Sequence, residues 1–308
     1  MPPDQAILLV GGAGFLGLAL ARRLVADGRT VHVLSRSSDD ARHDGITFHR
    51  GSQDDHVVVA PLLRECPIVV HLASTTTPGS SARRPQIDTL ENLLPAARLT
   101  EMMANHPPAR LLFASSGGAI YGNPTRLPVD ETHPPQPLSY HAAGKVALES
   151  LFEVFAQANR VPLATLRLSN LYGPGQRLRG GFGLVRTLLE RVRRGEPVEM
   201  WGDGGAIRDY LYIDDAVDAC RRLIGDPEAT GTFNVGSGLG ASISELIDLV
   251  GRVTGRVLQV RQRPARGTDV RAIVLDSTRL QRATGWRPLT DLPQGIQQTW
   301  RWLDRDDA

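Results

Sequence analysis

A glycine-rich stretch close to the N-terminus limits what this chain can fold into more than any other feature. Residues 6–17 read AILLVGGAGFLG, so an apolar run leads directly into glycines. Gly11, Gly14 and Gly17 follow one another at three-residue intervals. At this spacing the first glycine permits a tight turn, the second lets the backbone approach a diphosphate, and the third lets a helix pack closely on a strand.

The residues around these glycines supply the context that such a turn requires. Leucines recur at helical spacing after the turn, and a second apolar run covers residues 30–34. A helix beginning near Phe15 would present free N–H groups and the positive end of its dipole to phosphate. The order strand, glycine turn, helix and strand therefore predicts a dinucleotide-binding unit. Its predicted cofactor contacts are Gly11, Gly14, Phe15, Leu16 and Gly17.

The rest of the chain alternates in the same way. Apolar runs at 46–50, 68–74, 111–114 and 161–168 predict strands, and amphipathic segments at 88–105 and 140–157 predict helices. This alternation predicts an α/β fold, a Rossmann-like doubly wound parallel sheet with ligands at the carboxyl ends of its strands. Glycine and proline become frequent after Asn170. We therefore expect a dinucleotide-binding domain over 1–169, with return segments near 207–236, and a smaller, mainly substrate-binding α/β region over 170–308.

Composition excludes several other classes of function. The chain has 308 residues, a formal net charge of +2 and two cysteines. This balance argues against nucleic acid as a partner, and no run approaches the ~18 apolar residues of a membrane span. Two cysteines form no disulfide framework, and no pair of histidines or cysteines has metal-ligand spacing. We expect a cytoplasmic protein with no bound metal and no membrane partner.

Lysine usage singles out one position. The chain has 35 lysine and arginine residues, and Lys145 is the only lysine among them. Arginine is a broad, permanently charged fork, whereas lysine is a compact ammonium with an adjustable pKa. A lysine kept in so arginine-rich a chain indicates a site where arginine cannot substitute. The plainer interpretation is one surface lysine that persisted by chance.

The strand predicted after the first helix bears on the choice of cofactor. It ends in Ser35-Arg36. An acidic residue at this position would hold the ribose hydroxyls of NAD, whereas an arginine can pair with the 2′-phosphate of NADP. Arg36 favours NADP to a modest degree, and a solvated arginine at a strand end is the alternative. We therefore expect NAD or NADP.

Several further motifs, taken in order, resemble the extended short-chain dehydrogenase/reductase superfamily, in particular nucleotide-sugar epimerases and dehydratases of the UDP-galactose 4-epimerase type. The resemblance covers nearly the whole chain. It rests on GGAGFLG (11–17), HLAS (71–74), SSGGAIYG (115–122), RLSNLYGPGQ (167–176), WGDGGAIRDYLYIDD (201–215), FNVG (233–236) and ARGTD (265–269).

The resemblance implies a chemistry and a set of contacts. Members of this superfamily oxidise a sugar carbon by hydride transfer to nicotinamide, with a tyrosine as acid/base, a lysine four residues later and a Ser or Thr beside them. It also implies homodimers, formed by pairing the helices over 88–105 and 140–157, and a place in polysaccharide biosynthesis. The implied cofactor contacts are Gln53, Leu72, Ala73, Ser74 and Lys145, and the implied nucleotide-sugar contacts are Asn170, Arg208 and Arg266.

This chain departs from the family at the catalytic tyrosine. Tyr140 lies five residues before Lys145, and His141 lies four before it. Residues four apart share a helix face, so His141 takes the position of the family tyrosine. Three interpretations stay open: His141 is the acid/base, Tyr140 reaches the site through a local shift of the helix start, or the chain binds ligands without catalysis.

Two smaller features need interpretation. Gly117 occupies the position of the usual Ser or Thr, and Ser116 is the nearest substitute, with Ser115 behind it. Asp214 and Asp215 resemble paired catalytic carboxylates, but we interpret them as a helix N-cap and its neighbour.

The sequence as a whole predicts an NAD(P)-dependent C4 epimerase of a nucleotide-diphosphate hexose. The alternatives are an NADPH-dependent 4-keto-sugar reductase, favoured by Arg36, and a non-catalytic NAD(P)-binding or sensing protein, favoured by His141. Asn170 and Arg208 would serve a substrate, which argues against the sensing protein.

Overall fold

A sheet of seven strands forms the centre of the molecule, in the order β10-β6-β5-β4-β1-β2-β3. All of its neighbouring strands run parallel. The computed structural model describes the whole chain except residues 1–4, 38–44, 83, 179–182, 265–269 and 306–308. The strands are β1 (Ile7–Val10), β2 (Val31–Ser35), β3 (Ile46–Arg50), β4 (Ile68–His71), β5 (Arg110–Ser116), β6 (Leu163–Leu168) and β10 (Gly231–Val235).

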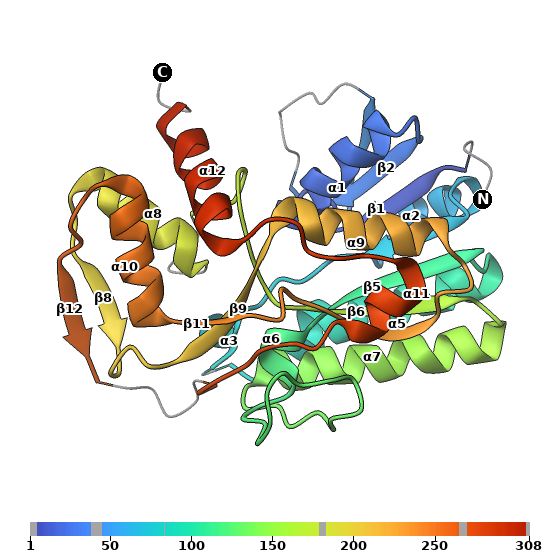
Figure 1. Cartoon of the computed structure of the whole chain (residues 1–308). Helices are drawn as coiled ribbons and strands as arrows, with labels where there is room; N and C mark the ends of the chain where they lie inside the picture. The colour runs from blue at the N-terminus through green and yellow to red at the C-terminus, as the bar shows by residue number, and fades with distance from the viewer. Residues whose placement is uncertain (1–4, 38–44, 83, 179–182, 265–269, 306–308) are drawn as a thin grey trace.

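Helices cover both faces of this sheet because its inner strands are apolar on both sides. Every residue of β1 and β4 is buried. Helices α1 and α9 pack together on one face, and α2, α5 and α7 lie on the other (Figure 1). This arrangement confirms the predicted doubly wound fold. The helices are α1 (Phe15–Ala26), α2 (His56–Glu65), α5 (Leu94–Asn105), α7 (Tyr140–Asn159) and α9 (Ile213–Gly225).

The strand order places a ligand crevice at the N-terminal strand. β1 lies between β2 and β4, because the chain runs outward from β1 through β2 to β3 and then crosses to the other side of β1 to form β4. Val10 at the end of β1 pairs with His71 at the end of β4. In doubly wound sheets, ligands bind outside the carboxyl ends of strands at such a switch point. The glycine turn follows β1 at this position.

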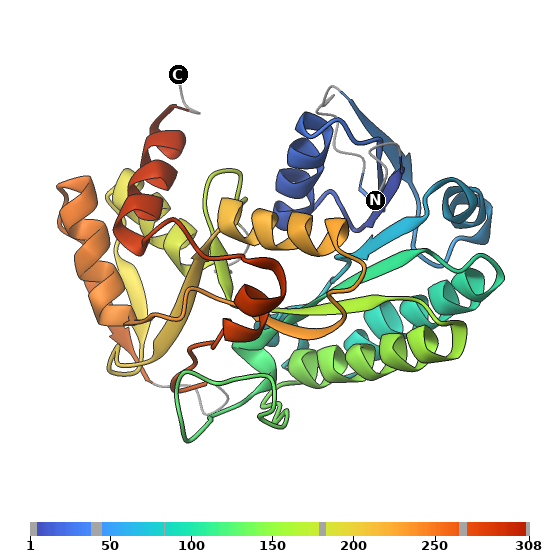
Figure 2. The same cartoon turned by 45° about the vertical axis from the view of Figure 1, so that its right-hand side comes forward.

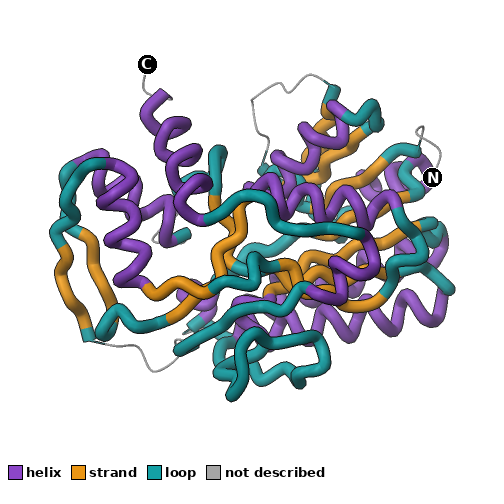
Figure 3. Tube along the Cα trace, in the orientation of Figure 1, coloured by secondary structure: helices purple, strands orange, loops and turns teal. Residues whose placement is uncertain are grey.

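A second group of elements lies at the other end of the molecule (Figure 2). It contains a three-stranded sheet, in the order β11-β9-β7, and the strand pair β12-β8, with helices around them (Figure 3). β10 returns from this part of the chain to the edge of the large sheet, beside β6. The elements are β7 (Asn170–Tyr172), α8 (Leu184–Arg194), β8 (Val198–Trp201), β9 (Ile207–Tyr212), β11 (Gly240–Ser242), α10 (Ile243–Thr254), β12 (Val260–Arg263) and α12 (Leu292–Arg305).

The helix predicted over 88–105 consists of three consecutive segments. The α-helical turn α4 (Gln86–Asp88) leads into a π-helical segment, η1 (Thr89–Leu93), which continues as α5. A π segment holds one more residue per turn than the flanking helix and is frequent at functional sites. Three short helices complete the described structure: α3 (Pro78–Ser81), α6 (Gly117–Ile120) and α11 (Thr278–Thr284). No helix in the described ranges is long and apolar enough to cross a membrane.

The predicted cap of α9 is wrong. Tyr212 is the N-cap, and Asp214 and Asp215 lie in the first turn of the helix. The carboxylate of Asp215 accepts the backbone N–H groups of Leu289 (2.9 Å) and Thr290 (3.0 Å). It therefore holds the segment that leads into α12, because a first-turn side chain can reach a neighbouring loop as readily as its own helix.

Candidate active site

The glycine turn joins β1 to α1 at the switch point of the sheet. Gly11 has a φ of +78°, and a Cβ there would lie 2.5 Å from the Cα of Ala73. A Cβ at Gly17 would overlap the backbone of Gly12. Among the described residues, a Cβ at Gly14 would approach only a carbonyl oxygen of the turn, at 3.5 Å. Space therefore stays open at the glycine predicted to face the diphosphate.

The first turn of α1 has N–H groups that no side chain caps. Gly14 is the N-cap residue and makes no side-chain hydrogen bond. The predicted contacts Phe15 and Leu16 lie in this turn, where backbone N–H groups favour an anion. The backbone N–H of Leu72 donates to the last residue of β1 (2.8 Å), which places the predicted residues 72–74 beside the turn. These features fit the diphosphate of a dinucleotide.

Two further predicted cofactor residues lie near the ends of β2 and β3. Arg36 directly follows β2 and is exposed. Gln53 is buried, and its Oε1 lies 2.6 Å from Nε2 of His71. Burial lowers the pKa of His71 to about 3, so its ring is neutral and belongs to the core. The Gln53 side chain is thus engaged by the protein, and Arg36 is free to face solvent or a ligand.

Helix α7 carries the residues that decide the chemistry. It begins where predicted, because the Ser139 hydroxyl accepts the backbone N–H of Ala142 (3.2 Å) as its N-cap. His141 and Lys145 lie on the buried face of the helix, whereas the side chain of Tyr140 is 49% exposed. The helix does not start with the shift that would bring Tyr140 to the face of Lys145.

Lys145 is held at the carboxyl end of the sheet. Its Nζ donates to the carbonyl oxygen of Ala114 in β5 (2.9 Å) and lies 5.1 Å from the centre of the Phe113 ring. Burial lowers the pKa of Lys145 to about 8, against the opposing effects of Glu149 and Asp88. The ammonium is therefore mostly charged at neutral pH and has a proton it can lose within the physiological range.

His141 makes a polar contact with the loop after β4. Its Nδ1 lies 3.0 Å from Oγ1 of Thr76 and 3.9 Å from Oδ1 of Asp88. Burial, together with the charge of Lys145, lowers the pKa of His141 to about 4, and Asp88 acts in the opposite direction. The imidazole is therefore neutral at pH 7 and can accept a proton.

The two candidate serines differ in their surroundings. Phe113 packs against α7, and alternation along β5 places Ser115 on that same face and Ser116 on the other. The Ser115 hydroxyl is buried and has no hydrogen-bond partner in the described part of the chain. Ser116 is half-buried at the end of the strand, where it precedes α6 without capping it. The face shared with α7 favours Ser115 over the predicted Ser116 as a substrate contact.

The predicted substrate residues come from adjacent strands of the second region. Asn170 on β7 donates from Nδ2 to the carbonyl oxygen of Asp209 on β9 (3.1 Å). Arg208 precedes Asp209, is half-buried and donates to the carbonyl oxygen of Ile207 (2.9 Å). Asn170 and Arg208 therefore lie near one another. Arg266 lies outside the described residues.

Sequence reasoning missed four polar residues at these sites. Thr76 and Asp88 lie beside His141, Asn92 bonds to both of them, and none of the three belongs to a motif named above. Asp209 is fully buried and accepts backbone N–H groups from two loops, one at 237–238 and one at Leu275. Burial raises its pKa despite these bonds. The four-residue spacing of Asp88 and Asn92 on a helix was the only local signal available.

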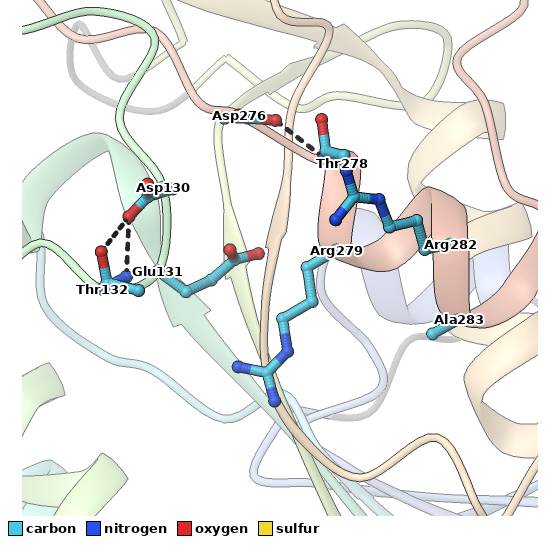
Figure 4. Close-up of a pocket in the computed structure, with 8 residues that line it drawn as sticks. All are labelled: Asp130, Glu131, Thr132, Asp276, Thr278, Arg279, Arg282 and Ala283. Atoms are coloured by element: carbon cyan, nitrogen blue, oxygen red, sulfur yellow. Dashed lines mark hydrogen bonds between the residues drawn. The ribbon is translucent and has the colours of Figure 1, made fainter.

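A separate cavity of about 610 Å³ lies away from these residues, and Figure 4 shows the side chains around it. One wall is a loop after α6, and the other is the segment that contains α11. None of the predicted site residues lines this cavity. Its lining residues are Asp130, Glu131, Thr132, Asp276, Thr278, Arg279, Arg282 and Ala283.

A parallel sheet with a glycine turn at its switch point, and a buried lysine on α7, define a class of dinucleotide-dependent enzymes. The model of the NAD dependent epimerase/dehydratase family matches residues 7–236. The chain belongs to this family, and the predicted resemblance is confirmed.

Individual relatives match over almost their whole length. A UDP-glucose 4-epimerase of Mycolicibacterium smegmatis is 32% identical over 301 residues, which cover 95% of this chain and 96% of the relative. The crystal structure of a Thermotoga maritima UDP-glucose 4-epimerase with UDP-glucose superposes with a TM-score of 0.92 at 31% identity, covering 99% of this chain and 100% of the other. A Thermus thermophilus UDP-glucose 4-epimerase complex with NAD superposes with a TM-score of 0.91 at 33% identity, covering 98% and 99%.

Proposed function

We propose that this protein is an NAD-dependent 4-epimerase of a UDP-hexose, with His141 as its acid/base. The observation that carries the proposal is the pair His141 and Lys145, both buried on one face of α7 at the carboxyl end of the sheet. The similarity to UDP-glucose 4-epimerases over nearly the full length supports the reaction and the nucleotide. The open space at Gly14 and the uncapped start of α1 fit the diphosphate of NAD.

Each residue of the pair has a distinct task in this proposal. Bound NAD supplies the hydride acceptor for carbon C4 of the sugar and returns that hydride in the second half-reaction. The Nε2 atom of His141 takes the proton of the C4 hydroxyl as the keto group forms, and gives it back when the hydroxyl is restored. Burial, together with the positive charge that Lys145 holds beside the site, keeps the imidazole neutral and able to accept that proton.

The substrate side of the proposal uses the second region. Asn170 and Arg208 lie on the neighbouring strands β7 and β9. A guanidinium forms paired hydrogen bonds with two phosphate oxygens, which suits Arg208 to the diphosphate of the sugar nucleotide. Asn170 would contact the same nucleotide sugar. Arg266 is proposed as a further diphosphate contact from the motif alone.

A direct assay tests this function. Purified protein is incubated with NAD and UDP-glucose, and in a separate reaction with UDP-galactose, and the sugar nucleotides are resolved by anion-exchange chromatography. We expect either substrate to yield the same equilibrium mixture of the two, with no net change in NADH absorbance because the hydride is returned. Net consumption of NADPH with a 4-keto-sugar nucleotide, and no interconversion, would contradict epimerisation.

The second candidate is an NADPH-dependent reductase of a nucleotide 4-keto-sugar. The exposed arginine after β2, Arg36, favours it, because this position faces the ribose of the cofactor in a doubly wound sheet. An Escherichia coli dTDP-4-dehydro-6-deoxyglucose reductase is 28% identical over 309 residues, covering 96% of each chain. The identity of a dinucleotide that copurifies with the protein separates the two, since an epimerase retains NAD and a reductase must exchange its cofactor.

Assembly and location complete the proposal. We propose a homodimer formed through the α4-η1-α5 and α7 helices. Leu90 and Val154 lie on these helices with 57% and 66% exposure, which supports a partner that covers them. Sedimentation at concentrations around the assay range tests the dimer.

Cys66 and Cys220 are both buried free thiols, which fits a reducing compartment such as the cytoplasm.

A further inference from the structure

The loop after β4 and the π segment η1 build a polar network against His141. One hydrogen bond in it has an unambiguous direction: the backbone N–H of Thr75 donates to Oδ1 of Asn92 (3.0 Å). The Asn92 amide is thereby oriented, so its Nδ2 must be the donor in its other contacts. Nδ2 lies 3.0 Å from Oγ1 of Thr76 and 3.1 Å from Oδ1 of Asp88.

Counting protons along this network determines which nitrogen of His141 is protonated. Thr76 has one hydroxyl proton, and its Oγ1 contacts Asn92, Asp88 and the imidazole. Asp88 as a carboxylate only accepts, so the hydroxyl of Thr76 donates to it. Both remaining contacts of Thr76 Oγ1 must then be accepted hydrogen bonds. Nδ1 of His141 is therefore the N–H of the neutral ring, and Nε2 has the free lone pair.

This network bonds only one oxygen of the Asp88 carboxylate, Oδ1. Its Oδ2 is buried and has no hydrogen-bond partner among the described residues. Its Oδ1 lies 3.9 Å from Nδ1 of His141. At such a distance in a partly buried site, opposite charges attract far more strongly than they do in bulk water. A proton arriving on the imidazole would therefore be stabilised by Asp88.

The packing of α7 keeps Asp88 close to the histidine. Gly144 lies beside Lys145, and a Cβ at this position would lie 3.3 Å from Cβ and 3.4 Å from Oδ1 of Asp88. Contacts this short would force the carboxylate to move by a few tenths of an ångström. The glycine therefore lets α4 approach the catalytic helix.

We propose that Thr76 and Asp88 are positioning residues: Thr76 holds His141 in the Nδ1–H tautomer, and Asp88 stabilises the imidazolium that forms during turnover. The proposal rests on the proposed function for the role of His141. In the oxidation step NAD, held at the glycine turn, would accept the hydrogen of C4 with the electron pair of the broken C4–H bond. The O–H bond breaks at the same time, its electron pair forms the carbonyl, and its proton binds Nε2. Nδ1–H stays bonded to Thr76 throughout.

The first test is spectroscopic and needs no substrate. Nitrogen-15 labelled histidine is incorporated, and two-bond proton–nitrogen correlation spectra of the wild-type protein and of His141→Gln assign the ring. We expect His141 to show a protonated Nδ1 and an unprotonated Nε2 at neutral pH. A protonated Nε2 in the wild-type protein would overturn the proposal whether or not the protein epimerises any sugar, and inactivity with the expected tautomer would overturn the proposed function alone.

The second test separates the two positioning roles by mutation. Thr76→Val should release the tautomer and lower kcat about 100-fold or more, since a wrong tautomer disables a histidine base. Thr76→Ser keeps the hydroxyl and should retain both the wild-type His141 tautomer and the wild-type kcat. Asp88→Asn keeps an acceptor oxygen toward Thr76, so we expect the tautomer to stay while kcat falls by about 10- to 100-fold through the lost charge. KM for the sugar should change little in each variant.

The matched control is Thr100→Val, because Thr100 is a buried threonine on α5 that bonds only to the backbone of its own helix, at Ala97. It should leave kcat and the His141 signals unchanged. Unchanged kcat and unchanged tautomer in Thr76→Val would overturn the role of Thr76. Unchanged kcat in Asp88→Asn would overturn the role of Asp88. Far-ultraviolet circular dichroism of each variant confirms that the compared proteins are folded.

Discussion

Two buried polar clusters pack against α7, one turn apart, and they are built on opposite principles. The closed cluster consists of Glu149, Arg167, Tyr121 and Asn234. Arg167 donates to both carboxylate oxygens of Glu149 and, through Nη1, to the hydroxyl of Tyr121 (2.9 Å). That hydroxyl donates to Oδ1 of Asn234 (2.7 Å). Each side chain of this cluster has a partner, and in the part of the chain that the structure describes none of its buried polar atoms lacks one.

The open cluster consists of Thr76, Asp88, Asn92, His141 and Lys145. Among the described residues, Oδ2 of its Asp88 carboxylate has no partner, and Nε2 of His141 forms no hydrogen bond. Burial lowers the pKa of Lys145 to about 8, close to neutral pH, and lowers that of His141 to about 4, so the imidazole is uncharged at pH 7. A buried polar network that is fully bonded stabilises the fold, whereas one with unsatisfied atoms is a candidate for chemistry.

The largest expected effect is the loss of turnover when the open cluster loses its base. His141→Ala should lower kcat by about 10²- to 10⁴-fold, the usual contribution of general acid–base catalysis. Affinity for NAD should stay within a few-fold, because the glycine turn is untouched. Epimerase kinetics and NAD titration measure the two. Turnover equal to that of the exposed-site control His106→Ala would remove His141 from the mechanism.

A substitution in the closed cluster should lower the free energy of unfolding and leave kcat nearly unchanged. Arg167→Met leaves Glu149 charged and buried without a partner, so the free energy of unfolding should fall by about 3–5 kcal/mol. Its control is Arg98→Met, which breaks an exposed ion pair with Asp54 and should cost less than about 1 kcal/mol. Urea denaturation measures both. If the folded Arg167→Met protein loses as much kcat as His141→Ala, the closed cluster is not purely structural and the proposed difference between the two clusters is wrong.

The lysine of the open cluster should impose a pH limit on activity. Because the pKa of Lys145 is lowered to about 8, its charge is present below this pH and is lost as the pH rises through it. Turnover of the wild-type protein should therefore decline above about pH 8. Lys145→Met should lower kcat and weaken NAD binding by about 10- to 100-fold, as expected for a lost hydrogen bond to a charged group. This variant should lack the alkaline decline, and a decline at the same pH in both proteins would assign it to another group.

The smallest expected effect concerns the tyrosine beside the catalytic face. Tyr140→Phe should leave kcat and KM unchanged, because the Tyr140 side chain is half exposed and lies outside both clusters. Steady-state kinetics at neutral pH check this. A loss of turnover comparable with His141→Ala would mean that the helix start rearranges when substrate binds.

These regions also differ in how far sequence alone could predict them. The glycine turn is predictable because its shape depends on backbone spacing, and spacing of four residues is enough to put His141 and Lys145 on one face. Thr76 and Asp88 were not predicted because only tertiary packing brings them to His141: Thr76 lies in the loop after β4, 65 positions away, and Asp88 ends α4, which packs against α7. Asp215 was misassigned for the same reason, since its partners lie in a distant loop.

The five residues of η1 separate Asp88, which contacts the catalytic histidine, from α5, the helix that follows η1. Regular α-helix turns by about 100° per residue, so deleting one residue from Thr89–Leu93 would rotate Asp88 by that angle relative to α5. The apolar stripe of α5 would keep its place in the core, and the carboxylate would leave His141. The length of this one π-helical turn thus sets whether the Asp88 carboxylate reaches His141, while the packing of α5 in the core does not depend on it.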